Sequence, residues 1–210
     1  MVLNVNKSNI RFLFNKPVFG DHTLNKNMKF SFLFPAFLLI IILAWCGCGT
    51  ATVKKDVSSS VFTCDKKADD ALKNKSYEKS IILHEFFIKE NPDNGLAMYH
   101  LGYSYGQLGD HENEIKYYEE AIKKGYYSPG IFFNLGMAYG ETERFDDAMK
   151  MFRKAIELNP EDEDAIYNLG TLYLETGKAE KAKEQLEKLM KIDPDGEMTL
   201  KLKDELDNRK

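Results

Sequence analysis

The sequence has little cysteine, little proline and no excess of positive charge, and each shortage excludes a class of protein. Three cysteines among 210 residues cannot form a disulfide framework. Six prolines and 14 glycines exclude a collagen-like or low-complexity chain. There are 29 basic residues against 33 acidic ones, so the net charge is −4 and a basic nucleic-acid-binding surface is not expected. The 43% of apolar residues suffices for the core of one domain.

Motifs for catalysis and for metal binding are equally scarce. His84, His100 and His111 have neither HExxH spacing nor a nearby cysteine pair, and no P-loop occurs. We interpret His84 as a packing residue and Cys64 as a packed or idle thiol. Residues 102–106 match the G-x-S-x-G pattern of a nucleophile elbow around Ser104, but they lie within a helical pattern where the elbow needs a strand. The sequence therefore predicts no enzyme, no metal site and no cofactor.

An acidic run at Glu161-Asp162-Glu163-Asp164 has a structural explanation. It lacks the alternating oxygen ligands of a calcium loop. It opens a predicted helix, where carboxylates favour the positive end of the helix dipole. We interpret the run as the start of that helix.

The one long apolar run lies near the N-terminus. No charged residue occurs between Phe30 and Val53, and Lys26 and Lys29 precede the run. A basic region, a short apolar centre and a small-residue exit are typical of a secretory signal. Pro35 and the shortness of the centre argue against a full span, which needs about 20 apolar residues.

The end of this run resembles the lipobox of bacterial lipoproteins, in which a cysteine after a small residue is lipidated and becomes the new N-terminus. Gly47 precedes Cys48, whereas the bulky Trp45 precedes Cys46, so we expect lipidation at Cys48. The family prefers Leu, Val or Ile three positions before the cysteine, and only Cys46, after Leu43, meets that preference. Cys46 is therefore the alternative acceptor. An uncleaved signal anchor and simple cleaved secretion are the other interpretations.

These features predict a targeting segment over 1–48, a flexible tether over 49–63 and a repeat domain over 64–210. Met28 would be an ordinary start for such a signal, so the residues before it are either an upstream extension or a cytoplasmic tail. A mature chain beginning at Cys48 would lack Lys7, Arg11, Lys16, Lys26 and Lys29 but only one acidic residue, Asp21. Its net charge would therefore be more negative than that of the full chain.

The rest of the sequence repeats itself with a period of about 34 residues. The recurring residues are Leu101, Leu135 and Leu169; Gly102, Gly136 and Gly170; and Tyr105, Tyr139 and Tyr173. Within each unit, apolar residues recur at i, i+3, i+4 and i+7, which indicates two amphipathic helices. Short breaks at 108–110, 142–143 and 176–178 separate the helices, and Ser128 before Pro129 predicts an N-cap.

A helix–turn–helix unit of about this length with these residues resembles the tetratricopeptide repeat. Residues Tyr167-Asn168-Leu169-Gly170 are close to the family's start of its first helix, helix A. The pattern of its second helix, helix B, is filled by Phe145, Ala148, Phe152, Ala155 and Pro160. The glycines are expected to let helix A approach its own helix B closely.

The resemblance implies an all-α, right-handed superhelical solenoid of three to four helix–turn–helix units. We expect good units at 95–128, 129–162 and 163–196. A degenerate unit at 61–94 lacks the leucine and glycine of helix A, so that helix is expected to be short. The tail over 197–210 is polar with a few apolar residues, as in a helix that caps the last unit.

In tetratricopeptide solenoids, positions 2, 5, 9, 12 and 13 of helix A line a concave groove. Carried onto this chain, positions 5, 9 and 13 give as partner-binding residues Tyr99, Tyr103, Gln107, Phe133, Met137, Glu141, Tyr167, Thr171 and Glu175. Aromatic and methionine side chains suit a peptide ligand, because they bury much area at small entropic cost. Packing between helices is the alternative role for Tyr99 and Tyr167. Positions 5 and 9 carry no Lys or Asn, so a clamp for a terminal carboxylate is not expected.

The two resemblances together imply a lipid-anchored adaptor of the bacterial cell envelope, facing the periplasm, that binds a protein or peptide. It resembles repeat lipoproteins that assist pilus or secretion assembly and those that dock envelope hydrolases and proteases. Gly49 is not the Asp that retains some lipoproteins at the inner membrane, which favours the outer membrane. The alternative is a scaffold, signal-anchored in the inner membrane, that self-associates. Neither interpretation involves nucleic acid or a small-molecule substrate.

Overall fold

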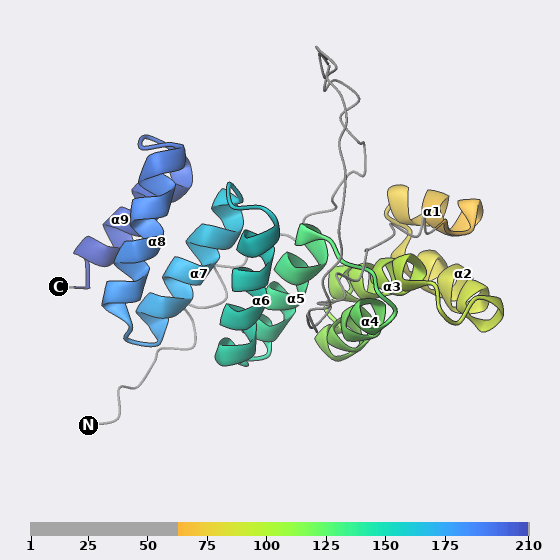
Figure 1. Cartoon of the computed structure of the whole chain (residues 1–210). Coiled ribbons are helices and arrows are strands. Elements are labelled where there is room, and N and C mark those ends of the chain that lie inside the picture. Colours follow the sequence, from red (N-terminus) through yellow and green to blue (C-terminus); the bar gives the residue numbers. More distant parts are fainter. Residues whose placement is uncertain (1–62, 210) are drawn as a thin grey trace, which may run out of the picture. The chain divides into compact units, whose positions relative to one another are not determined.

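The computed structural model describes residues 63–209, which are all-α. The helices are α1 (Lys66–Lys73), α2 (Tyr77–Glu90), α3 (Gly95–Gln107), α4 (His111–Lys123), α5 (Pro129–Glu141), α6 (Phe145–Leu158), α7 (Glu163–Glu175), α8 (Ala179–Ile192) and α9 (Glu197–Asp207). Each packs against the helices next to it in sequence (Figure 1). None of these described helices is long and apolar enough to cross a bilayer. The predicted targeting segment, Cys46 and Cys48 lie outside the described residues.

The helix boundaries keep the period of the sequence. Helices α3, α5 and α7 begin at Gly95, Pro129 and Glu163, and each is followed after a short turn by its helix B. The helix pairs α3/α4, α5/α6 and α7/α8 lie within 95–128, 129–162 and 163–196, respectively. Helix α9 begins at Glu197, one period after Glu163, and takes the place of a further helix A.

Each regular helix A begins with the same type of N-cap hydrogen bond. The residues before α3, α5 and α7 are Asn94, Ser128 and Asp162, and each side chain accepts a hydrogen bond from the backbone N–H of the third residue of its helix. Such a bond satisfies one of the N–H groups that a helix start leaves unpaired. The predicted cap at Ser128 is confirmed, and the acidic run contains the cap of α7.

The turn between the two helices of a unit depends on one residue in the left-handed region. Lys75, Gly109, Glu143 and Gly177 have φ values of 58°, 78°, 59° and 72°, and they occupy the same position in successive units. Glycine adopts this conformation without steric cost, whereas Lys75 and Glu143 adopt it under the constraint of the helices on either side. The backbone of the turn therefore repeats even where the residue does not.

Helix A and helix B meet most closely at a glycine. A Cβ atom added at Gly102 would lie 2.5 Å from a ring carbon of Tyr118, and one added at Gly136 would lie 2.9 Å from a ring carbon of Phe152. Both rings are fully buried. The predicted close approach is confirmed in these two units, and each buried ring contributes about 1.5–3 kcal/mol.

The last unit fills the same space differently. Leu186 stands in the slot of Tyr118 and Phe152, and its aliphatic side chain is smaller than a ring. A Cβ atom added at Gly170 would lie 2.6 Å from Leu202 of α9 instead. Leu202 is fully buried, so α9 covers the open end of the stack as expected of a capping helix.

The first unit is degenerate in the way that its sequence indicated. Helix α1 has 8 residues, whereas α3, α5 and α7 have 13 each. Its buried residues are Ala68, Ala71 and Leu72. So small an apolar face contributes little to holding α1 on the neighbouring helices.

Hydrogen bonds between side chains link consecutive units. In each bond, a repeat tyrosine of helix A meets a residue on helix B of the preceding unit. The pairs are Tyr105 with Glu85, Tyr139 with Glu119 and Tyr173 with Arg153. The tyrosine hydroxyl donates to the carboxylate in the first two pairs and accepts from the guanidinium in the third.

We expect Gly102→Ala to destabilise the chain by about 1–3 kcal/mol, because the new methyl group would overlap the buried ring of Tyr118. The matched control is Gly130→Ala in α5, where the nearest atom to an added Cβ is 3.6 Å away. That variant should be neutral or slightly stabilising, because alanine favours helix more than glycine does. Urea unfolding followed by circular dichroism measures both changes. Equal effects of the two substitutions would contradict the packing argument.

Candidate functional site

The structure divides the predicted groove residues into a partly exposed set and a buried set. Tyr103, Gln107, Glu141 and Glu175 are partly exposed. The buried residues, with exposed fractions of 2–7%, are Tyr99, Phe133, Met137, Tyr167 and Thr171. Three of the buried residues, Tyr99, Phe133 and Tyr167, contact side chains of neighbouring segments, so one of their roles is packing.

The contacts of the buried aromatic residues lie within the repeat core. The Tyr99 ring stacks on Tyr126 at a centroid distance of 5.2 Å. The Phe133 ring meets Phe152 edge-on at 5.7 Å. Tyr103 has a more open position, where its ring edge meets Tyr77 of α2 at 6.4 Å, and partial burial raises the pKa of its hydroxyl.

One groove position forms a polar row across the repeats. Gln107, Glu141 and Glu175 occupy equivalent positions, each at the C-terminal end of its helix A. The Gln107 side-chain oxygen accepts a hydrogen bond from the Tyr77 hydroxyl at 3.2 Å. Glu175 forms an ion pair with the guanidinium of Arg209, which also donates to the carbonyl oxygen of Leu174 at 3.1 Å. The last member of the row therefore already holds a basic side chain of this chain.

Helix α9 continues the helix A faces. Glu205 stands one repeat after Thr171 and accepts hydrogen bonds from Tyr167 at 2.7 Å and from Thr171 at 3.1 Å. Burial, followed by the bond to Glu205, raises the pKa of the Tyr167 hydroxyl. These contacts attach the cap to α7 through two of the predicted groove residues.

Ser104 is placed where a nucleophile cannot act. It is fully buried within α3, and its hydroxyl lies 2.8 Å from the carbonyl oxygen of His100 and 3.0 Å from the Ser80 hydroxyl. The helix replaces the strand–turn–helix geometry that an elbow requires. The match to G-x-S-x-G is therefore a coincidence of the repeat glycine and tyrosine with a serine.

A buried glutamate occupies a helix B position where later units carry alanine. Glu114 is 3% exposed and stands where the next two units carry Ala148 and Ala182. Gly106 makes room for it, since a Cβ atom there would overlap the Glu114 carboxylate. His111 Nδ1 lies 2.8 Å from Glu114 Oε2. Burial raises the pKa of Glu114, while the contact with Glu114 raises that of His111.

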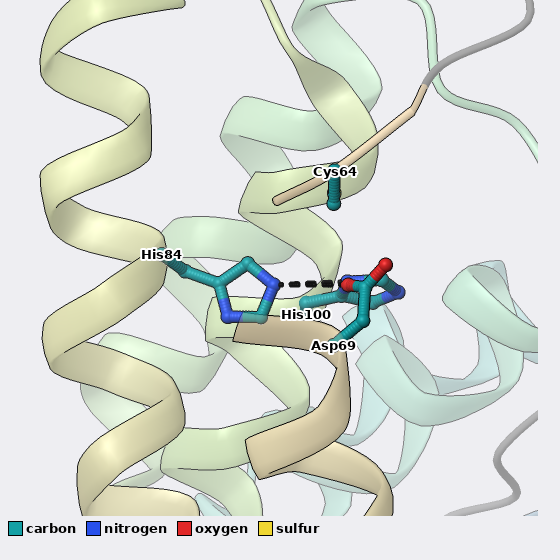
Figure 2. Close-up of side chains that lie close together, drawn as sticks. All are labelled: Cys64, Asp69, His84 and His100. Carbon is teal, nitrogen blue, oxygen red and sulfur yellow. Dashed lines mark hydrogen bonds and ion pairs between the residues drawn. The ribbon is translucent and has the colours of Figure 1, made fainter. Parts of the chain in front are cut away.

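Four potential metal ligands meet at the N-terminal end of the described residues (Figure 2). They are Cys64 just before α1, Asp69 on α1, His84 on α2 and His100 on α3. His84 Nε2 lies 3.1 Å from His100 Nδ1 and 3.4 Å from Asp69 Oδ1, and the last two atoms are 3.1 Å apart. The four ligand atoms all lie within 4.8 Å of one another. We call these four residues the His–Asp–Cys cluster.

Hydrogen bonds around the His–Asp–Cys cluster orient the ring of His84. Its Nδ1 atom lies 2.9 Å from the carbonyl oxygen of Ser80, which only accepts, and 3.1 Å from the Ser80 hydroxyl, which can also donate. In the neutral tautomer that donates to the carbonyl, the lone pair is on Nε2, which faces the other ligands. Asp69 Oδ1 is buried without a well-aligned hydrogen-bond partner among the described residues.

Burial and the neighbouring histidines shift the pKa of Asp69 in opposite directions. Burial raises the pKa of the Asp69 carboxyl, but His100 and His84 beside it outweigh burial and hold that pKa below its usual range. Burial raises the pKa of the Cys64 thiol, and the charges of Asp69 and Asp65 raise it further. The sequence predicts no metal site here, because these residues show no metal-binding spacing along the chain.

Family comparisons identify the repeat. Profiles described as tetratricopeptide repeat match residues 96–123 and 141–203. These two segments of the chain are therefore tetratricopeptide repeats. This family is a scaffold family and typically has no enzymatic activity. A comparison with curated protein sequences finds no significant match.

Solved tetratricopeptide repeat structures share this fold. A crystal structure of MamA is 24% identical, covers 70% of this chain and 91% of its own, and has a TM-score of 0.60. A tetratricopeptide repeat protein from Parabacteroides merdae is 18% identical, with coverages of 67% and 56% and a TM-score of 0.62. The first repeat domain of Spaghetti (RPAP3), bound to the HSP90 peptide SRMEEVD, is 21% identical, with coverages of 55% and 91% and a TM-score of 0.50.

We expect the stability contributed by His111 to decrease as pH rises. A histidine whose pKa is raised by folding stabilises the fold most below its ordinary value of about 6.5, and the gain is lost as pH passes the raised value. The free energy of unfolding of the parent chain should exceed that of His111→Gln by about 1 kcal/mol at pH 5.5, since partial exposure screens the pair. Denaturant unfolding should show this difference shrinking towards pH 8. A difference that grows with pH would contradict the assignment.

Proposed function

We propose that the chain is a membrane-tethered adaptor whose tetratricopeptide repeats bind a basic and apolar segment of a partner protein along helices α3, α5 and α7. The fold supports this proposal, because its helix A faces recur at a constant spacing and so match an extended or helical ligand. The Spaghetti repeat domain bound to a peptide offers a precedent for ligand binding on this fold.

The ion pair between Arg209 and Glu175 is the main support for a basic ligand. Glu175 ends the polar row of helix A positions, and it holds a guanidinium of this chain's own C-terminal segment. Glu141 stands at the equivalent position one unit earlier and is partly exposed. We infer that Glu141 binds a basic side chain of the partner in the same way, since an arginine–carboxylate pair has directional hydrogen bonds as well as charge.

Tyr103 supplies the apolar part of the same surface. It is partly exposed, and its ring is oriented by the edge contact with Tyr77. An amphipathic aromatic side chain that is already held in place binds a ligand at small entropic cost. Phe133 and Met137 support this surface from below, because both are buried.

The proposed surface disfavours an acidic peptide such as SRMEEVD. Glu141 and Glu175 lie along the row, and a ligand carboxylate near Glu141 would be repelled. The absence of Lys and Asn at positions 5 and 9 agrees with this choice. The ligand class proposed for this chain therefore differs in charge from the peptide bound to the Spaghetti domain.

We expect photo-crosslinking to locate the partner on this surface. A photoreactive amino acid at Gln107 should crosslink one protein in intact membranes, and the same residue at Tyr127 should not. Tyr127 is a suitable control, because it is 56% exposed and lies in the turn after α4.

Glu141→Gln should weaken binding of the identified segment about tenfold. The matched control is Glu143→Gln, which alters an exposed glutamate of the neighbouring turn. Equal crosslinking at both positions, or equal affinity of the two variants, would contradict the proposed surface.

We further propose that the tether is a lipid on Cys48, which places the repeats at the envelope, with the outer membrane favoured. An inhibitor of lipoprotein signal peptidase should cause an unprocessed precursor to accumulate, as should Cys48→Ser. Cys46→Ser should leave processing intact. Cys46 is the acceptor instead if only its substitution blocks processing. A chain whose size the inhibitor does not change would instead favour the signal-anchored scaffold.

A further inference from the structure

We propose that the His–Asp–Cys cluster binds one zinc-type ion in a closed tetrahedral site. The ligands would be Cys64 Sγ, an oxygen of Asp69, His84 Nε2 and His100 Nδ1, which come together from three helices and the segment before them (Figure 2). A set of two imidazoles, one carboxylate and one thiolate is borderline-soft, and zinc favours such nitrogen and sulfur donors.

The distances between three of the ligand atoms match a tetrahedral ion. Two ligands that are each about 2.0–2.1 Å from a tetrahedral ion lie about 3.3–3.4 Å from each other. The three observed separations among His84, His100 and Asp69 are 3.1, 3.1 and 3.4 Å. An ion at bonding distance from all three would therefore sit less than about 1 Å out of their plane.

The fourth ligand requires only a local adjustment. Cys64 Sγ lies within 4.8 Å of the other ligand atoms, whereas a bound thiolate would be about 3.5 Å from them. Cys64 precedes α1 in an irregular segment, so its side chain can rotate without disturbing a helix.

Groups around the cluster orient its ligands as outer groups of metal sites do. The Ser80 carbonyl lies 2.9 Å from His84 Nδ1 and can accept its proton, and in that tautomer the lone pair of Nε2 would face the ion. The Ser104 hydroxyl of α3 lies 3.0 Å from the Ser80 hydroxyl, within hydrogen-bond distance. Asp69 Oδ1 is buried and lies 3.1 Å from His100 Nδ1 and 3.4 Å from His84 Nε2, so an ion among these three atoms would satisfy it.

The two histidines occur only where the first described unit meets the second. The equivalent positions of the later units carry no histidine. The slots of His84 and His100 are filled in later units by Tyr118 with Asn134, by Phe152 with Asn168 and by Leu186 with Leu202. Packing alone is satisfied in those slots by side chains that bind no metal well. Packing therefore does not explain why two imidazoles face each other at this boundary.

A metal ion would supply what the degenerate unit lacks. Helix α1 has only Ala68, Ala71 and Leu72 buried, so its apolar face holds it weakly. An ion bound by the His–Asp–Cys cluster would connect α1 and the segment before it to α2 and α3. Small units with little core commonly depend on such a metal. We infer that the ion fastens the N-terminal end of the solenoid next to the proposed tether.

The test uses the full-length chain in detergent with Cys46→Ser and Cys48→Ser, so that Cys64 is the only thiol. After chelation under reducing conditions, cobalt should bind with a stoichiometry of one. It should show the intense visible bands of a tetrahedral ion and a thiolate-to-cobalt band in the near ultraviolet. One equivalent of zinc should remove both signals and raise the melting temperature.

The repeat itself suggests variants that keep the fold. His84→Phe and His100→Asn insert the residues found in the equivalent slots of a later unit, Phe152 and Asn168. Each should retain the parent's helicity and lower zinc affinity at least about 100-fold, since loss of a ligand costs more than loss of an outer partner. His111→Gln is the control and should bind zinc as the parent does. Failure of the folded parent to bind, or equal affinity of His100→Asn, would reduce the cluster to a metal-free hydrogen-bonded network. A cobalt complex without the thiolate band would overturn the four-ligand assignment.

Discussion

The packing of the helix pairs α3/α4 and α5/α6 is set by the contact between a glycine of helix A and a large side chain of helix B. At Gly102 and Gly136 the helix axes come so close that a single methyl group would overlap a buried ring. This approach determines how each pair packs and therefore where the next pair begins. The recurring N-caps, left-handed turn residues and tyrosine hydrogen bonds all keep the same register because the pair beneath them does.

The unusual chemistry lies where this constraint weakens. At the C-terminal end Leu186 is too small to fill the space above Gly170, and Leu202 of α9 completes the packing. At the N-terminal end of the described residues α1 is short. The buried side chains around His84 there are polar and include Ser80, His100 and Ser104. At each end of the described stack the regular contacts between repeats are incomplete, so residues there can take other roles, such as capping by α9 or the proposed metal binding.

Most of the fold was predictable from the sequence, and the reason is the short range of the forces involved. Helix starts at Gly95, Pro129 and Glu163 follow from a cap and an apolar periodicity that span only a few residues. The shortness of α1 and the capping by α9 followed from missing or added apolar residues. The groove positions carried over from the family stay a prediction, although the structure shows that Phe133 and Tyr167 also pack between helices.

The repeat, its period, the order of the helices and the apolar segment before them follow from the residues alone, since each depends on neighbours a few residues apart. That Cys64, Asp69, His84 and His100 meet, and that Arg209 reaches Glu175, follows only from the folded chain. Residues on different helices become neighbours only when the helices and their units stack. A slot-by-slot comparison of the repeats would have flagged the two histidines, but the distances that make them a candidate metal site arise from packing alone.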